Sequence, residues 1–102
     1  LYAPDFARIV SMILKNPGMV GLSEPINIAQ NFGLSIRELV QLINGHFSNK
    51  FTIRWNHDMP DGAPKKVMDD TQFKKVFKGF EFTPFEKGVE STIQYYNSIY
   101  PY

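Results

Sequence analysis

The chain has 102 residues, with 11 Lys or Arg and 10 Asp or Glu, so its formal net charge is +1 at pH 7. This near-neutral balance argues against a dedicated nucleic-acid-binding protein, and the lack of cysteine excludes disulfides, thiolate metal sites and a cysteine nucleophile. A hydrophobic fraction of 43% is too high for a disordered chain, and no apolar run approaches the ~18 residues needed to cross a membrane, so we expect a soluble domain. The lack of cysteine fits a reducing compartment, and we expect a cytoplasmic location.

The first predicted element is a one-sided helix that ends at residues 16–18 (Asn-Pro-Gly). Pro4 is tolerated in its first turn. Its apolar positions recur at the spacing typical of a helix that packs on one side: Phe6, Ile9, Val10, Ile13 and Leu14. A polar connection that includes Ser23 leads to residues 25–29, whose alternating pattern predicts a short strand.

A capping box marks the start of the second helix. In residues 35–38 (Ser-Ile-Arg-Glu), the Ser35 hydroxyl and the Glu38 carboxylate can each satisfy a backbone N–H that the helix leaves free. We expect this helix to stop within residues 45–48. Its predicted buried face consists of Ile36, Leu39, Val40, Ile43 and Phe47. Residues 50–55 then alternate apolar and polar side chains, which predicts a half-buried strand.

The remaining elements follow a loop at residues 56–66, which two prolines and one glycine stiffen. Residues 67–68 predict a short strand, and Asp69 or Asp70 is expected to cap a third helix. Residues 83–86 (Thr-Pro-Phe-Glu) predict a second capping box. The last helix would bury a stripe made of Phe85, Val89, Ile93, Tyr96 and Tyr100. We therefore expect an α/β fold, a single lobe over residues 1–102 with about four helices and two or three short strands.

The chain carries none of the common catalytic signatures, such as a glycine-rich phosphate loop or a His-Glu-x-x-His zinc motif. His46 and His57 lack the spaced partners that a zinc site requires. Four carboxylates could gather around a divalent cation: Asp58, Asp61, Asp69 and Asp70. Turn formation and helix capping explain these four residues more simply.

The most distinctive feature of the loop is a pair of lysines, Lys65 and Lys66, beside the rigid Pro64. Two ammonium groups held close to backbone amides suit a diphosphate, because its negative charges favour cationic donors. From the residues alone, a solvated charged turn is the simpler interpretation.

Five segments, in the same order along nearly the whole chain, resemble the C-terminal part of the extended short-chain dehydrogenase/reductases that act on nucleotide sugars, the NAD-dependent epimerase/dehydratase family. They are residues 1–7, 25–28 (Pro-Ile-Asn-Ile), 34–39 (Leu-Ser-Ile-Arg-Glu-Leu), 60–69 (Pro-Asp-Gly-Ala-Pro-Lys-Lys-Val-Met-Asp) and 85–89 with Thr92 and Tyr95. The loop motif Pro-Asp-Gly-x-Pro-basic-Lys is similar to that of the branch that makes GDP-fucose from GDP-4-keto-6-deoxymannose.

This resemblance implies a role in binding a nucleotide sugar, most simply a GDP-sugar. At the matching positions, Lys66 would contact the diphosphate and Asp61 would lie near the nucleoside. Lys65 belongs to the same substrate-binding loop and stands where the family usually has Arg. The point charge of its ammonium group therefore replaces a guanidinium that could bind phosphate through two hydrogen bonds. The complete enzyme would be a cytoplasmic homodimer that uses NADP, with no nucleic-acid or membrane partner.

The same resemblance implies a separate N-terminal Rossmann domain, which would carry the glycine loop for the cofactor, the catalytic Ser and the Tyr-x-x-x-Lys pair. None of these motifs occurs in the 102 residues. We therefore expect a fragment without catalytic, cofactor-binding or metal-binding residues, which alone binds NADP weakly at most and catalyses no turnover.

Two interpretations from other classes stay open. Residues 33–39 also resemble the capped helix of a helix-turn-helix or winged-helix DNA-binding module, although that helix offers only Arg37 as a cationic side chain. A protein-interaction domain would instead present an exposed aromatic patch around Phe80 and Phe82, which the absent domain could equally cover.

Overall fold

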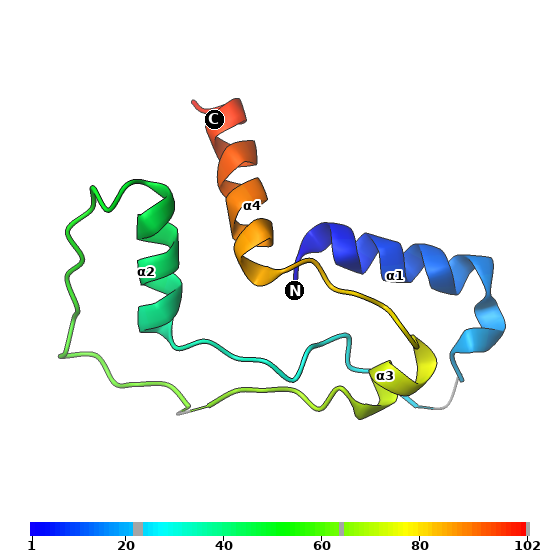
Figure 1. Ribbon diagram of the computed structural model, residues 1–102. Coiled ribbons are helices and arrows are strands. Elements are labelled where there is room, and N and C mark those ends of the chain that lie inside the picture. The colour runs from blue at the N-terminus through cyan, green and yellow to red at the C-terminus, as the bar shows by residue number, and fades with distance from the viewer. Residues whose placement is uncertain (22–23, 64, 102) are drawn as a thin grey trace.

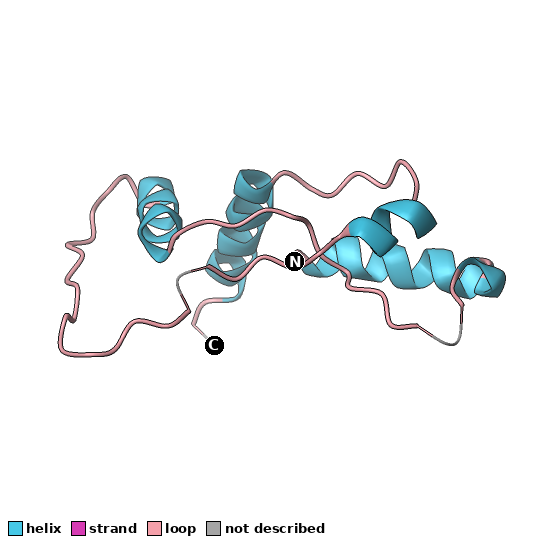
Figure 2. Cartoon of the chain, turned by 90° about the horizontal axis from the view of Figure 1, so that it is seen from below, coloured by secondary structure: helices cyan, strands magenta, loops and turns pink. Residues whose placement is uncertain are grey.

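The computed structural model describes residues 1–21, 24–63 and 65–101. Within these ranges the chain forms four α-helices and one short 3-10 turn: α1 (Ala3–Lys15), η1 (Pro17–Met19), α2 (Ile36–His46), α3 (Thr71–Val76) and α4 (Phe85–Ile99) (Figure 1). The described residues contain no β-strand, and long loops join the helices (Figure 2). The expected α/β class is therefore wrong, because the described part of the chain is helical.

Two of the helices form where local sequence signals are strong. α1 has Pro4 in its first turn and ends where the Asn16 N–H donates to the carbonyls of Met12 and Ile13. In α2 the Ser35 hydroxyl accepts the Glu38 N–H at 3.2 Å, while the Glu38 carboxylate accepts the Ser35 N–H at 2.7 Å. The predicted helix, its capping box and its end near residue 46 are confirmed, but its predicted buried face is wrong, because no residue of α2 is buried and Ile36 is 66% exposed.

The strands expected at residues 25–29 and 67–68 are absent. The two segments do lie side by side and run in opposite directions (Figure 1), with the Asn27 side chain donating to the Asp69 carbonyl at 3.4 Å. However, no backbone hydrogen bond joins the described residues of these segments. A strand requires a backbone ladder, and side-chain contacts replace that ladder here.

The strand expected at residues 50–55 is also absent, because one side chain takes the place of a neighbouring strand. The Asn44 amide donates to the Phe51 carbonyl at 3.0 Å and its oxygen accepts the Phe51 N–H at 3.1 Å. The apolar side of this segment is not buried, since Phe51, Ile53 and Trp55 are 49%, 39% and 37% exposed. Its alternating pattern therefore describes a face that the described residues cover only in part, such as Phe47 beside Phe51 and Arg37 over Trp55.

The core lies where α1 meets α3 and the segment after it. Ile9, Phe73 and Phe77 are buried, and half-buried side chains that include Phe80 and Phe82 pack against them. The Phe73 ring stacks on Phe77 at 4.8 Å and meets the Phe82 ring at 5.1 Å. Phe80 and Phe82 are thus part of the core rather than the exposed patch expected of an interaction domain.

The start of α4 differs from the prediction. Pro84 is the N-cap, so the proline precedes the first helical residue, and no side chain caps the helix. Thr83 lies one residue before this N-cap, and its hydroxyl and its N–H both donate to Asp5. The predicted buried stripe is also wrong, since Phe85, Tyr96 and Tyr100 are 40%, 51% and 73% exposed.

The helices are spread out. In both views α2 lies at one end, α1 and α3 lie at the other, and α4 stands between them (Figures 1 and 2). The radius of gyration is 17.3 Å, whereas a compact domain of about 100 residues measures about 13 Å. None of the helices in the described ranges combines the length and the apolar character needed to cross a membrane.

Candidate functional site

The end of the lysine loop borders a hollow of about 370 Å³ beside the start of α2. Lys66 lines this hollow, which we call the Lys66 hollow, and its side chain is exposed. The other residues around it are mostly apolar: Leu1, Ile28, Ala29, Gln30, Phe32, Gly33, Leu34, Leu39, Val67, Met68 and Phe85. One cation on an apolar wall is an arrangement that suits a ligand with a charged group and a less polar body.

Gly33 fixes how closely the lysine loop approaches the segment before α2. A Cβ atom at Gly33 would lie 3.1 Å from the Val67 Cγ2 atom and 3.9 Å from the Lys66 carbonyl oxygen. The lack of a side chain thus lets the two segments pass in near contact. This close approach places Lys66 at the edge of the hollow.

Two aromatic rings also line this hollow. Phe85, the first residue of α4, lies 6.1 Å from Phe32 between ring centroids, with the rings tilted by 52°. Both rings are about half exposed, at 40% and 52%. They offer flat apolar surfaces on which a sugar or a nucleobase could stack.

The nearby carboxylates are already paired. Hydrogen bonds from Lys74, and then from the Asn31 N–H, hold the pKa of Asp70 below its ordinary value. The Thr71 hydroxyl and N–H lower the pKa of Asp69 in the same way. Among the described residues, Lys66 forms no ion pair. Its charge is therefore available to an anion.

The structure separates the three residues that the sequence placed in one substrate-binding loop. Lys66 lines the Lys66 hollow, whereas Asp61 and Lys65 are exposed and do not line it. Pro64, which was expected to stiffen the lysine pair, lies outside the described residues, as do Ser23 and Tyr102.

The metal-site alternative has no support in the described ranges, which hold no group of three or more His, Asp or Glu side chains able to bind an ion. The DNA-binding alternative does not fit either. A helix-turn-helix places two helices across a turn of three or four residues, whereas the described residues between η1 and α2 are non-helical. Arg37 lies 4.9 Å from the centroid of Trp55, so its guanidinium already covers an aromatic ring.

Sequence reasoning missed a second and larger hollow of about 680 Å³ next to α3. It shares Phe32 and Phe85 with the Lys66 hollow and carries Lys74 and Lys78. Lys74 lies in α3, but Lys78 follows the end of that helix, so no helical spacing in the sequence identifies the pair. No local sequence signal identifies Phe85 as part of the wall of these two hollows, because its position depends on residues far away in the sequence.

Comparison with curated proteins identifies a similar protein from rice (Oryza sativa subsp. japonica), described as "Probable GDP-L-fucose synthase 1". The two are 26% identical over 97 residues, which make up 94% of this chain and 28% of the rice protein. The chain thus spans little more than a quarter of that relative. No family model matches the chain, and no solved structure is significantly similar to it. These findings support no more than a distant relationship to the epimerase/reductase family.

Proposed function

We propose that this chain is the nucleotide-sugar-binding lobe of an NADP-dependent epimerase or reductase related to GDP-L-fucose synthase, with a GDP-sugar as substrate. The observation that carries the proposal is the Lys66 hollow, in which an unpaired cation borders apolar walls. The family-like loop that ends in Lys66 and the similarity to the rice protein point in the same direction.

In this proposal Lys66 holds the diphosphate. An ammonium group attracts phosphate oxygens as a point charge, and a charge-assisted hydrogen bond is about twice as strong as a neutral one. The Phe32 and Phe85 rings supply apolar surface beside it. Asp61 would lie near the nucleoside, and Lys65 would supply a second positive charge for the diphosphate, from the exposed loop that leads to the hollow.

The hollow is small for the whole ligand. Its volume of about 370 Å³ is near the lower end of the range of ligand pockets, about 300–1,000 Å³. We therefore assign the rest of the nucleotide sugar, the NADP and the redox step to an N-terminal Rossmann domain of a longer homodimeric protein. The 102 residues alone would orient substrate and set selectivity, and would show no hydride transfer.

Isothermal titration of GDP into the full-length protein tests this role. We expect Lys66→Ala to weaken GDP binding about tenfold, because a hydrogen bond to a charged group contributes roughly 1.5–3 kcal/mol and this one is partly exposed to solvent. Lys66→Arg should keep most of the affinity. Lys15→Ala, which removes an exposed lysine at the end of α1, is the matched control. Equal affinity of the wild type and Lys66→Ala would remove Lys66 from the site.

A further inference from the structure

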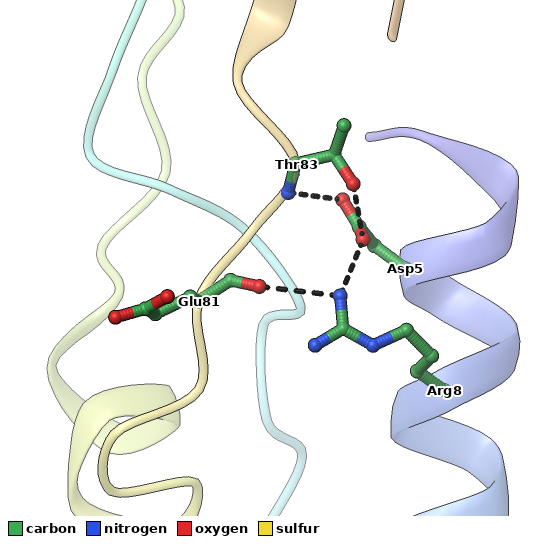
Figure 3. A network of polar contacts seen from close by, with 4 residues as sticks. All are labelled: Asp5, Arg8, Glu81 and Thr83. Carbon is green, nitrogen blue, oxygen red and sulfur yellow. Dashed lines mark hydrogen bonds and ion pairs between the residues drawn. The ribbon is translucent and has the colours of Figure 1, made fainter. Parts of the chain in front are cut away.

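A buried carboxylate joins α1 to the segment that leads into α4. Asp5 is 1% exposed and accepts three hydrogen bonds, from the Thr83 N–H at 2.9 Å, the Thr83 hydroxyl at 2.9 Å and Arg8 at 3.0 Å (Figure 3). Hydrogen bonds to a charged acceptor are stronger than neutral ones, and here the acceptor itself is buried. The contact between Asp5 and Thr83 is therefore a firm one.

Arg8 holds the same segment at two further points. The nitrogen that binds Asp5 also donates to the Glu81 carbonyl at 3.3 Å (Figure 3). The guanidinium carbon lies 4.6 Å from the centroid of the Phe80 ring. Residues 80, 81 and 83 are thus attached in succession to one face of α1, which leaves this segment little freedom to shift.

The attachment ends immediately before a wall of the proposed site. Phe85 follows Thr83 by two residues and lines the Lys66 hollow. α4 has no side-chain cap of its own to fix where it begins. Near its start it also approaches the N-cap residue of α1 at Gly88, where an added Cβ would lie 3.5 Å from the Tyr2 ring. The position of Phe85 is consequently set from α1.

We infer that Asp5 is a positioning residue for the nucleotide-sugar site, acting through Thr83 on the Phe85 ring. The inference rests on the proposed function. It assigns Asp5 no contact with the ligand. It predicts that loss of the Asp5–Thr83 contact moves the aromatic wall and weakens ligand binding while Lys66 stays in place.

A fluorinated phenylalanine at position 85 of the full-length protein reports on the wall by fluorine NMR. In the absence of ligand, Thr83→Val should change the fluorine shift, because valine has the shape of threonine without the hydroxyl. Thr83→Ser should restore the shift. Ile9→Val, which trims the buried core on the same helix without touching Asp5, should leave it unchanged.

GDP titration of the same variants completes the test. We expect Thr83→Val to weaken GDP binding at least about twofold, with Thr83→Ser and Ile9→Val close to wild type. An unchanged fluorine shift and unchanged GDP affinity in Thr83→Val would overturn the positioning role. If Lys66→Ala also left the affinity unchanged, the proposed function itself would fail, so the two failures can be told apart.

Discussion

Asp5 accepts both the backbone N–H and the side-chain hydroxyl of Thr83, each at 2.9 Å, across 78 residues of sequence. The sequence predicted Thr83 to be a helix cap, yet its N–H and its hydroxyl donate to a carboxylate in α1. This contact is the main polar link between α1 and the start of α4.

Removing that carboxylate should destabilise the chain strongly. Asp5→Ala leaves the two donors of Thr83 and the charge of Arg8 without their acceptor, so we expect the free energy of unfolding to fall by about 3 kcal/mol. Asp5→Asn keeps the shape and one acceptor oxygen and should cost less. Urea denaturation of the 102-residue chain measures both. Asp58→Ala, on an exposed loop, should change stability by less than about 0.5 kcal/mol, and an equal loss in both alanine variants would contradict the role of Asp5.

The capping box at the start of α2 gives a second prediction. Ser35→Ala removes the hydroxyl that accepts the Glu38 N–H, and loss of such a cap costs about 1 kcal/mol. The measurement is the urea midpoint of the chain, with Ser11→Ala as the control because Ser11 is an exposed serine within α1. A stable Ser35→Ala variant would show that the helix does not depend on its cap.

Stability should depend on pH through Asp70. Its folded-state pKa lies below the ordinary value, chiefly because of Lys74 and then because of the Asn31 N–H. Its contribution is therefore fully present above the unfolded-state pKa of about 4 and is lost as pH falls through the lower folded-state pKa. When the urea midpoint is measured from pH 7 down to pH 2, it should decrease as the pH drops below about 4. The decrease should be less steep in Asp70→Asn. Identical slopes would exclude Asp70 as a source of the pH dependence.

Gly33 should resist substitution because of the space around it. In Gly33→Ala the new Cβ would lie 3.1 Å from the Val67 Cγ2 atom, so the Val67 side chain beside Lys66 must give by a few tenths of an ångström. We expect a loss of about 1 kcal/mol and weaker GDP binding. Gly62→Ala is the control, since nothing lies within 4 Å of a Cβ there. Similar behaviour of the two variants would show that the close approach is unimportant.

The helices could be predicted from sequence because their signals are local. The apolar spacing of α1 and the Ser35 capping box act within a few residues. A strand depends on a partner elsewhere, and an alternating pattern does not reveal whether that partner exists. Residues 50–55 show this, because Asn44 occupies the backbone groups of Phe51 that a strand would share.

Only one part of the candidate site, Lys66, could be predicted from the sequence. Lys66 stood out because it follows a stiff, family-like loop. The hollow beside it depends on Gly33, whose role is visible only once Val67 is placed against it. Its aromatic wall depends on Phe85, which is positioned through the long-range contact between Asp5 and Thr83. Neither dependence leaves a periodic signal in the sequence.

Above all, we propose that Lys66 binds the diphosphate of a nucleotide sugar. A crystal structure of the full-length protein with bound GDP-mannose tests it most directly. We predict that the Lys66 Nζ atom lies about 2.7–3.2 Å from a diphosphate oxygen, with Phe85 beside the ligand. A diphosphate bound elsewhere on the protein, with the Lys66 hollow empty, would contradict the claim.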